Sequence, residues 1–417
     1  MKSEKQTRHL FSLPKIHFHY SFFTIHFSLF MTAHLRLFFN HSTSRAIGLV
    51  FAMQGLLFGT WSAMIPFIKQ KFQLDEAQLG LLLLALPVGI TIMNPISVGI
   101  LHRLGTVRAT MLARTLGALF FVIPFLMPNV WLVAAALMLL GTTFSTTNVS
   151  MNTAATTLGN YEGIRIMATC HALWSSGAMF GSAIGATAMG MGIPPVTHVM
   201  LIGSILLLST LVIYQAFQRV PSEVTVSRSN GPRPKFKMPS AALWGLIAIS
   251  LCTNLTEGTM ADWSAVYMRE VVQAPAALWG WGFAAYAFFM AMTRFTGDAI
   301  LKNYGGGPVL RIGGMIAASG LLLAILFPYT PTTLIGFAMV GAGVSLGAPV
   351  LYSAAAKVPG MAPGAGLATM NTFAMVGFLG GPAVIGFIAK AFSLPMALGV
   401  VVLMGCVWIW RAGYLKA

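Results

Sequence analysis

Charged side chains are scarce in this sequence. Asp, Glu, Lys and Arg make up 8% of its 417 residues, and hydrophobic residues make up 57%. A soluble globular domain carries roughly 25% charged residues. Acidic residues are especially few, with 9 Asp and Glu against 25 Lys and Arg. This composition excludes a water-soluble domain and indicates a chain whose main surroundings are a lipid bilayer.

Cysteine and the common catalytic motifs are also scarce or missing. The three cysteines, Cys170, Cys252 and Cys406, lie far apart inside apolar runs, which favours small core residues over a disulfide framework or a metal site. No GxxxxGK[ST] loop occurs, so the sequence does not support ATP hydrolysis by this chain. No nucleophile–base constellation stands out. We therefore expect no enzyme, no metal and no cofactor other than a coupling proton.

The positive charge is distributed as expected for membrane loops. The net charge of +16 lies in short gaps between apolar runs and forms no continuous face, which argues against nucleic-acid binding. If the N-terminus is cytoplasmic, 21 of the 25 Lys and Arg fall on the cytoplasmic side. Without the first 45 residues the ratio is still 15 to 4. Both termini are therefore predicted to be cytoplasmic.

Residues 1–45 form an N-terminal tail with an unusual composition. The tail holds six histidines, and their spacing matches no metal-ligand pattern. It also lacks the ordered features of a signal peptide. Met31 is an alternative start, so we base no function on this segment.

Twelve apolar runs follow from Ala46 onward, each long enough for a membrane helix of about 20 residues. Six lie in residues 46–217 and six in residues 241–411. Residues 218–240 are basic and rich in proline, which predicts a solvated cytoplasmic linker, and residues 412–417 form a C-terminal tail. The predicted fold is an all-α integral membrane protein with twelve transmembrane helices in two halves.

The two halves repeat at an offset near 200. Trp61-Ser62-Ala63 is matched by Trp263-Ser264-Ala265. Four glycines are matched in the same order: Gly105, Gly141, Gly177 and Gly181 correspond to Gly305, Gly341, Gly377 and Gly381. Their nearly constant offset predicts a parallel duplication of six spans.

Two parallel six-helix halves joined by a basic loop resemble the major facilitator superfamily. Residues 99–108 are similar to the loop signature of that family, although His102 stands where the family has Asp. The second copy, residues 297–305, departs further from the signature. The resemblance implies that this motif gates the cytoplasmic face, through Arg103, Gly105, Arg108, and the one-turn pair Arg294 and Asp298.

A narrower resemblance is carried by residues 257–263, 171–177 and 345–363. These stretches are similar to the bacterial inner-membrane branch that includes YbjJ-like proteins and lies near the fucose permeases. The resemblance covers about residues 46–411. It implies a transporter of a small-molecule solute in the bacterial inner membrane, and we expect a monomer.

Two acids lie inside the seventh apolar run. Glu257 is about 24 Å from the cytoplasmic end of its helix, and Asp262 is one to two turns further on. A charge near the bilayer centre costs about 3 kcal/mol, so an intramembrane acid needs a reason. We interpret Glu257 as a proton-coupling or solute-binding carboxylate, or else as a packing acid satisfied by its neighbours. Asp262 is the weaker coupling candidate because its depth allows it to be hydrated.

The remaining candidates for solute binding are polar or aromatic residues in apolar runs: Gln54, Asn148, Asn152, His171, Trp174 and Asn371. Proton-coupled sugar permeases of the superfamily carry acids on the first and fourth spans. This chain has Gln54, Asn148 and Asn152 there, which weakens coupling by that route. The two asparagines share a helix face and suit an uncharged polar ligand, or hydrogen bonding between helices. His171 is a solute ligand or a structural histidine.

Three further features have structural interpretations. Trp61 and Trp263 lie near span ends and are interpreted as interfacial anchors in preference to stacking platforms. Gly177, Gly181 and Gly185 form a stripe of small residues for close helix packing. The leading hypothesis is a secondary transporter for a polar solute. The alternatives are an efflux protein of the same fold, a membrane sensor or assembly partner, and a membrane enzyme.

Overall fold

A computed structural model describes residues 35–164, 166–221, 240–358 and 365–413. The described residues 35–41 belong to a unit separate from residues 42–413, and residues 35–40 are helical. Most of the predicted tail and of the predicted linker lies outside the described residues. The first half of the second unit contains α2 (Ser42–Lys71), α3 (Glu76–Leu83), α4 (Ala85–Leu126), α5 (Val130–Glu162), α6 (Met167–Gly190) and α7 (Pro195–Phe217). The second half contains α8 (Ala241–Glu270), the 3-10 turn η1 (Ala276–Leu278), α9 (Trp281–Tyr304), α10 (Gly306–Leu326), α11 (Thr330–Val344), α12 (Gly347–Ala356), α13 (Ala365–Ala391) and α14 (Leu394–Ala412).

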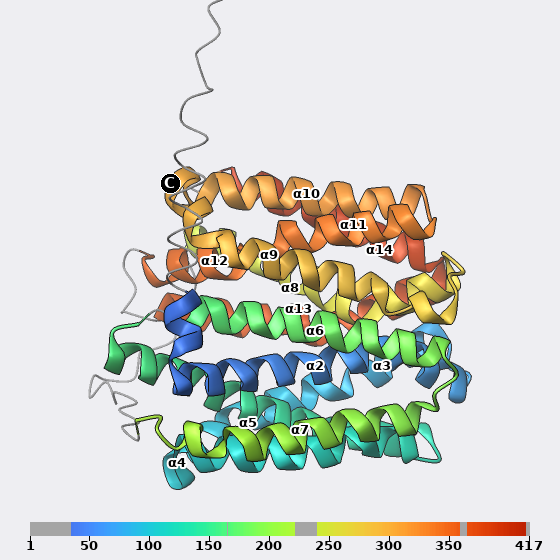
Figure 1. Ribbon diagram of the computed structural model, residues 1–417. Helices are drawn as coiled ribbons and strands as arrows, with labels where there is room; N and C mark the ends of the chain where they lie inside the picture. Colours follow the sequence, from blue (N-terminus) through green and yellow to red (C-terminus); the bar gives the residue numbers. More distant parts are fainter. Residues whose placement is uncertain (1–34, 165, 222–239, 359–364, 414–417) are drawn as a thin grey trace, which may run out of the picture. The chain divides into compact units, whose positions relative to one another are not determined.

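The described helices run alongside one another (Figure 1). Nine stretches among the described residues are long and apolar enough to cross a membrane. One of them, Glu76–Leu126, makes two crossings because the chain turns back at Gly105. Lys71 at the end of α2 holds the end of the second crossing, because its Nζ donates to the carbonyl of Phe125 at 2.9 Å. Two further helices, α6 and α8, are not among these nine stretches because they carry more polar or small residues. When they are added, and Glu76–Leu126 is counted as two crossings, the described helices fit the expected fold of 12 membrane helices.

The backbone confirms the parallel duplication. Gly105 has φ 76° and ψ 160°, and Gly305 has φ 75° and ψ 162°. Both are turns between helices in a region of φ that only glycine adopts without strain. Two non-glycine residues with positive φ also lie at matching positions, Gln73 (50°) and Gln273 (55°), after α2 and α8. Equivalent turns therefore adopt the same conformation in the two halves.

The glycine stripe on α6 packs directly against α2, as the sequence predicted. A Cβ built on Gly177 would overlap the carbonyl oxygen of Ala52, and one on Gly181 would overlap that of Leu56. The interpretation of the two tryptophans as interfacial anchors is wrong. Trp61 is 3% exposed and Trp263 is fully buried. Both lie inside the helix bundle because α2 and α8 extend past the predicted ends of their spans.

We call the end of the bundle that carries residues 42, 217, 241 and 412 the linker end, and the opposite end the far end. At the far end the two halves are joined by charged side chains. Lys69 Nζ lies 2.7 Å from Glu270 of the second half and 2.9 Å from Glu76 of its own half. Arg269 donates to the carbonyl of Pro66 at 2.8 Å.

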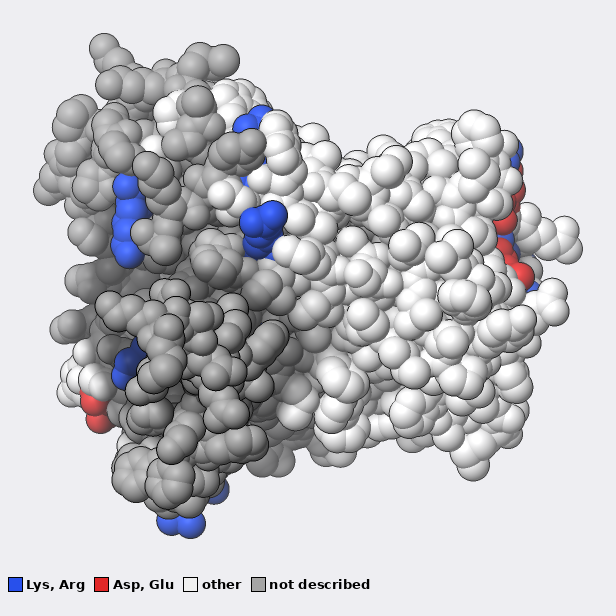
Figure 2. Space-filling view, turned by 90° about the horizontal axis from the view of Figure 1, so that it is seen from above, with Lys and Arg blue, Asp and Glu red and all other residues white. Residues whose placement is uncertain are grey.

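Three further contacts join the halves at the far end. Lys390 pairs with Asp75 at 2.8 Å. Ser62 Oγ donates to the carbonyl of Ala261, and Ser182 Oγ donates to the carbonyl of Gly280. Figure 2 shows the resulting charge pattern on one face, with charged side chains at the two ends and uncharged atoms between them. An uncharged middle is the band that a bilayer requires.

Arg114 lies elsewhere than the sequence predicted. The charge distribution makes Arg114 one of the 21 basic residues expected on the cytoplasmic side, but it is 1% exposed inside the first half. Its guanidinium donates to Thr210 Oγ1 at 3.1 Å, to Ser209 Oγ at 2.7 Å and to the carbonyl of Val50 at 3.5 Å. Arg114 therefore joins α2, α4 and α7 and is not a loop charge.

Substitution of alanine at two different glycines tests the close packing of α6 against α2. We expect Gly177→Ala to lower the melting temperature, because the new methyl group forces α2 and α6 apart at a cost of about 1–3 kcal/mol. Gly258→Ala is the matched control. No atom lies within 4 Å of its added Cβ, so the higher helix propensity of alanine raises the melting temperature. Thermal unfolding in one detergent measures both, and equal shifts would contradict the packing described here.

Protonation of Asp75 weakens one of the far-end contacts. The hydrogen bond from Lys390, helped by the Gln78 amide, holds the pKa of Asp75 below its usual value of 3.8. The pair therefore stabilises the fold above that value and is lost as the pH falls through the lowered pKa. Asp75→Asn keeps the helix cap. It should lower stability by less than about 1 kcal/mol near neutral pH, since the pair is exposed. The difference should vanish in acid; a difference that persists there would assign the effect to the cap.

Candidate functional site

Two oppositely charged side chains lie at the same depth between the halves. Glu257 on α8 and Arg294 on α9 are each about 20 Å from the far end of their helices. Their charges interact, although no direct ion pair joins them. Arg294 also interacts electrostatically with His171, Tyr286 and Tyr352. This group of side chains brings α6 of the first half together with α8, α9 and α12 of the second.

Arg294 is held by both halves. Its Nη1 donates to Ser175 Oγ on α6 at 2.8 Å, and its Nε donates to the carbonyl of Ser345 at 3.4 Å. Ser345 follows the last residue of α11, where the tenth crossing breaks before α12 begins. The C-terminal end of a helix carries partial negative charge, so a guanidinium at the end of α11 is stabilised. Broken helices of this kind line solute sites in transporters.

Glu257 differs from Arg294 because none of the described residues donates a hydrogen bond to its carboxylate. The side chain is only partly buried, so water can reach it. The neighbouring Gly258 is buried, yet a Cβ placed on it would meet no atom within 4 Å. Asn254, one turn away on α8, is also partly accessible. An open space therefore lies beside this part of α8.

Aromatic side chains of both halves pack together into an aromatic wall. Phe58 packs on Trp174 at 5.5 Å and on Phe283 of the second half at 6.1 Å, and Phe283 stacks on Tyr286 at 5.5 Å. The hydroxyl of Tyr286 is buried without a hydrogen-bond partner among the described residues. Trp174, predicted as a binding residue, thus contributes through an aromatic cluster shared by both halves.

Of the predicted polar residues, His171 interacts with Arg294 and so belongs to this group. His171 packs edge-on against Phe51 at 5.3 Å and is partly accessible. Gln54 is 6% exposed, and its Nε2 has no partner among the described residues. Asn152 donates to the carbonyl of Asn148 at 2.8 Å and approaches its Oδ1 at 3.1 Å. The two asparagines are thus bonded to each other on one helix.

Other predicted residues lie apart from Glu257. Asp262 is partly buried beside the contact of Ser62 with Ala261 near the far end. Asn371 on α13 is partly accessible and lies nearer the linker end. Arg103 and Arg108 are exposed on either side of the turn at Gly105. The position of Asp298 on α9 is described but its side chain is not. The sequence places Arg294 with these gating residues, but it lies about 15 Å from the linker end of α9, at the depth of Glu257.

Sequence reasoning missed several members of the group: Ser175, Tyr286, Tyr352, Phe58 and Phe283. Tyrosine and serine are common in membrane helices, so single residues gave no signal. The signal that was available is Arg294 itself, a cation inside an apolar run, which has the same need of a partner as Glu257. Counting it as a loop charge hid that need.

The arrangement suits reversible binding of a polar molecule. Arg294 and the hydroxyls donate hydrogen bonds, Glu257 accepts them or takes up a proton, and the aromatic wall offers an apolar surface. Within the described ranges, no three His, Cys, Asp or Glu side chains gather to hold a metal ion. Among the described residues of this group, no nucleophile is paired with a base, so the arrangement favours binding over chemistry.

Comparison with known proteins gives the family. The model of the Major Facilitator Superfamily matches residues 47–275. An uncharacterized transporter, y4wD, of Sinorhizobium fredii is 30% identical over 372 residues, covering 86% of this chain and 94% of the relative. An uncharacterized MFS-type transporter of Yersinia pestis is 30% identical over 85% of this chain and 91% of the relative.

Solved structures share the fold at low sequence identity. The E. coli fucose:proton symporter FucP is 18% identical with a TM-score of 0.62, covering 89% of this chain and 98% of that one. A bacterial homologue of the lysosomal transporter Spinster, in an inward-facing and unoccupied conformation, is 12% identical with a TM-score of 0.66, covering 88% and 95%. From its sequence relatives and its twelve-helix fold, this chain belongs to the major facilitator superfamily of membrane transporters.

Proposed function

We propose that this protein is a secondary active transporter that moves a small polar solute across a bacterial inner membrane by alternating access. The observation that carries the proposal is the opposed pair Glu257 and Arg294, at mid-depth between halves that are joined at the far end. A charge at this depth is costly, so its retention favours a role in binding. An efflux protein of the same fold is the second candidate, because nothing in the arrangement favours a direction of transport.

The conformation supports a cavity open toward the linker end. Lys69, Arg269 and Asp75 take part in contacts that close the far end, and Glu257 is nevertheless accessible. Most of the Lys and Arg outside the bundle belong to loops at the linker end, which favours a cytoplasmic position for that end and for both termini. On this proposal the described conformation is inward-facing, and the expectation of a monomer stays a prediction.

Glu257 is the residue that we assign to proton coupling. Its carboxylate is accessible and has no hydrogen-bond donor among the described residues, so protonation changes its charge without breaking a structural bond. Arg294 is then free to take an anionic or hydroxyl group of the solute. The structural relatives include a fucose:proton symporter and a nucleoside transporter, whose named solutes are small and polar.

Glu257→Gln tests the coupling role. We expect the variant to lose uphill uptake in proteoliposomes, so that the solute ratio across the membrane falls to about one, while solute exchange continues. The amide keeps the size and most of the polarity of the side chain but cannot carry a proton. The solute for the assay is one that raises the melting temperature in a library screen. Glu162→Gln, at an exposed acid at the end of α5, is the control and should behave as wild type.

Unchanged uphill transport by a folded Glu257→Gln protein would remove the coupling assignment. No flux of any stabilising solute, together with a stable complex with another protein, would favour a sensor or assembly partner instead.

Asp262→Asn distinguishes the role of Asp262 from that of Glu257. We expect it to retain uphill uptake, since Asp262 lies near the far-end closure.

Lys69→Gln tests the closure of the far end. The substitution leaves Glu76 and Glu270 close together without their shared cation, and their repulsion should open the far end. A cysteine placed at Gly258 in a Cys406→Ser background reports the opening. An impermeant maleimide added from the far side should label it faster in Lys69→Gln than in the parent.

Lys71→Gln is the matched control for this experiment. Lys71 is two residues away on the same helix, and its Nζ donates only to carbonyls of its own half, Phe125 and Met127, both at 2.9 Å. Labelling should therefore stay at the parent rate. Equal rates in all three proteins would show that Lys69 does not hold the halves together.

A further inference from the structure

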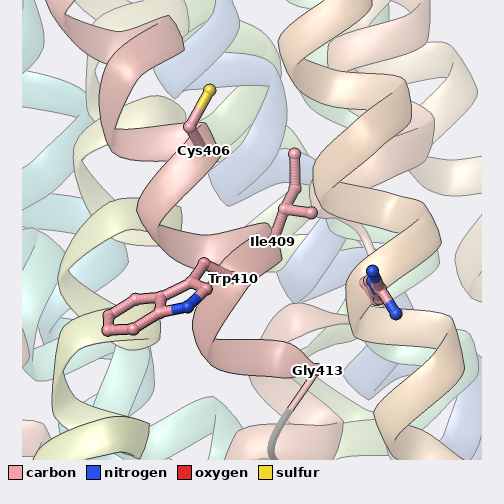
Figure 3. Close-up of a pocket in the computed structure, with 5 residues that line it drawn as sticks. Cys406, Ile409, Trp410 and Gly413 are labelled. Carbon is pink, nitrogen blue, oxygen red and sulfur yellow. The ribbon is translucent and has the colours of Figure 1, made fainter.

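We infer that a pocket between α10 and α14 binds the phosphate headgroup of an anionic phospholipid. The pocket has a volume of about 470 Å³ and lies at the linker end of the second half. It is lined by Arg311, Cys406, Ile409, Trp410 and Gly413. Figure 3 shows four of these residues along the last turns of α14. The pocket is separate from the group around Glu257.

The pocket lies on the outer, lipid-facing side of the bundle. Its neighbours on both helices expose large apolar side chains: Ile312 and Met315 on α10, and Leu403 and Val407 on α14. Arg311 is about 8 Å from the start of α10, and Trp410 is in the last turn of α14. This depth corresponds to the boundary between acyl chains and headgroups, where tryptophan is enriched.

The charge of the pocket complements a lipid phosphate. Arg311 is exposed, and its guanidinium makes no hydrogen bond or ion pair with another described residue. Arg411 does not line the pocket, but it lies 4.6 Å from the ring centroid of Trp410, which does, and so places a second cation beside it. Gly413 has no side chain, and the Arg311 guanidinium lies over it: a Cβ built there would be 3.9 Å from Arg311 Cζ. Basic pockets between membrane helices are suited to anionic headgroups, and the apolar wall of Ile409 suits an acyl chain.

The chain contains its own reporter for this pocket. Of the three cysteines, Cys170 and Cys252 are buried and Cys406 is exposed. A maleimide should therefore label Cys406 alone in the folded protein. A lipid seated in the pocket covers this thiol and slows the labelling.

The experiment measures the labelling rate of the full chain in an uncharged detergent, with added phosphatidylglycerol or phosphatidylcholine. We expect phosphatidylglycerol to protect Cys406 and phosphatidylcholine to have little effect. Arg311→Gln should weaken the protection about fivefold in lipid concentration, the effect of one cation near an anionic surface. Arg103→Gln, an exposed arginine at the turn of α4, is the control and should retain the wild-type protection.

Each other outcome overturns the inference. Equal protection by the two lipids would mean that only acyl chains enter the pocket. Protection by inorganic phosphate alone would identify a site for a free anion. If Arg311→Gln does not fold, raised salt on the wild-type protein replaces it. Salt must then weaken the protection by phosphatidylglycerol, and protection that is indifferent to salt contradicts the role of Arg311.

Discussion

Lipid offers no hydrogen bonds to a charged side chain, so every charge inside the bundle must be satisfied by protein or water. Arg114 and Arg294 meet this requirement in different ways. Arg114 is enclosed within one half by two hydroxyls and a carbonyl, and its contacts join three helices. Arg294 bonds to Ser175 of the other half and faces Glu257, whose carboxylate finds no donor among the described residues. One cation is therefore part of the scaffold, whereas the pair at mid-depth keeps unused hydrogen-bonding capacity, as the proposed solute site requires.

The sequence predicted the class of fold well because the bilayer imposes length and polarity on every helix. Matching glycines also predicted the duplication, since a turn such as Gly105 needs a backbone that only glycine adopts without strain. The site was harder to predict. Loop and cavity cations look alike in a sequence, so Arg294 was assigned to the cytoplasmic face. The prediction that the two tryptophans are interfacial anchors was wrong for a related reason. Helix ends are poorly defined by sequence, and Trp263 is buried because α8 continues to Glu270. Whether Asn148, Asn152 and Asn371 bind a solute stays a prediction.

The duplication also explains how the far end closes. Lys69 and Arg269 occupy matching positions at the ends of α2 and α8, and each reaches across to the other half. Lys69 finds Glu270, and Arg269 finds the carbonyl of Pro66. Two equivalent helix ends thus supply reciprocal bonds around the axis that relates the halves. Such reciprocity distributes the closing contacts evenly, so that no single loop has to move for the far end to open.

In the proposed alternating-access cycle the far end has to open without leaving a buried charge unpaired, because breaking a buried ion pair costs about 3–5 kcal/mol. The contacts at the far end avoid this cost. When the halves part, Lys69 loses Glu270 but keeps Glu76, which belongs to its own half. Glu270 is already exposed and can be hydrated where it stands. Opening would therefore exchange the contact between Lys69 and Glu270 for water at the surface. The bond of Arg294 to Ser175 lies near mid-depth, where the rocking motion of the proposed cycle would move the halves least.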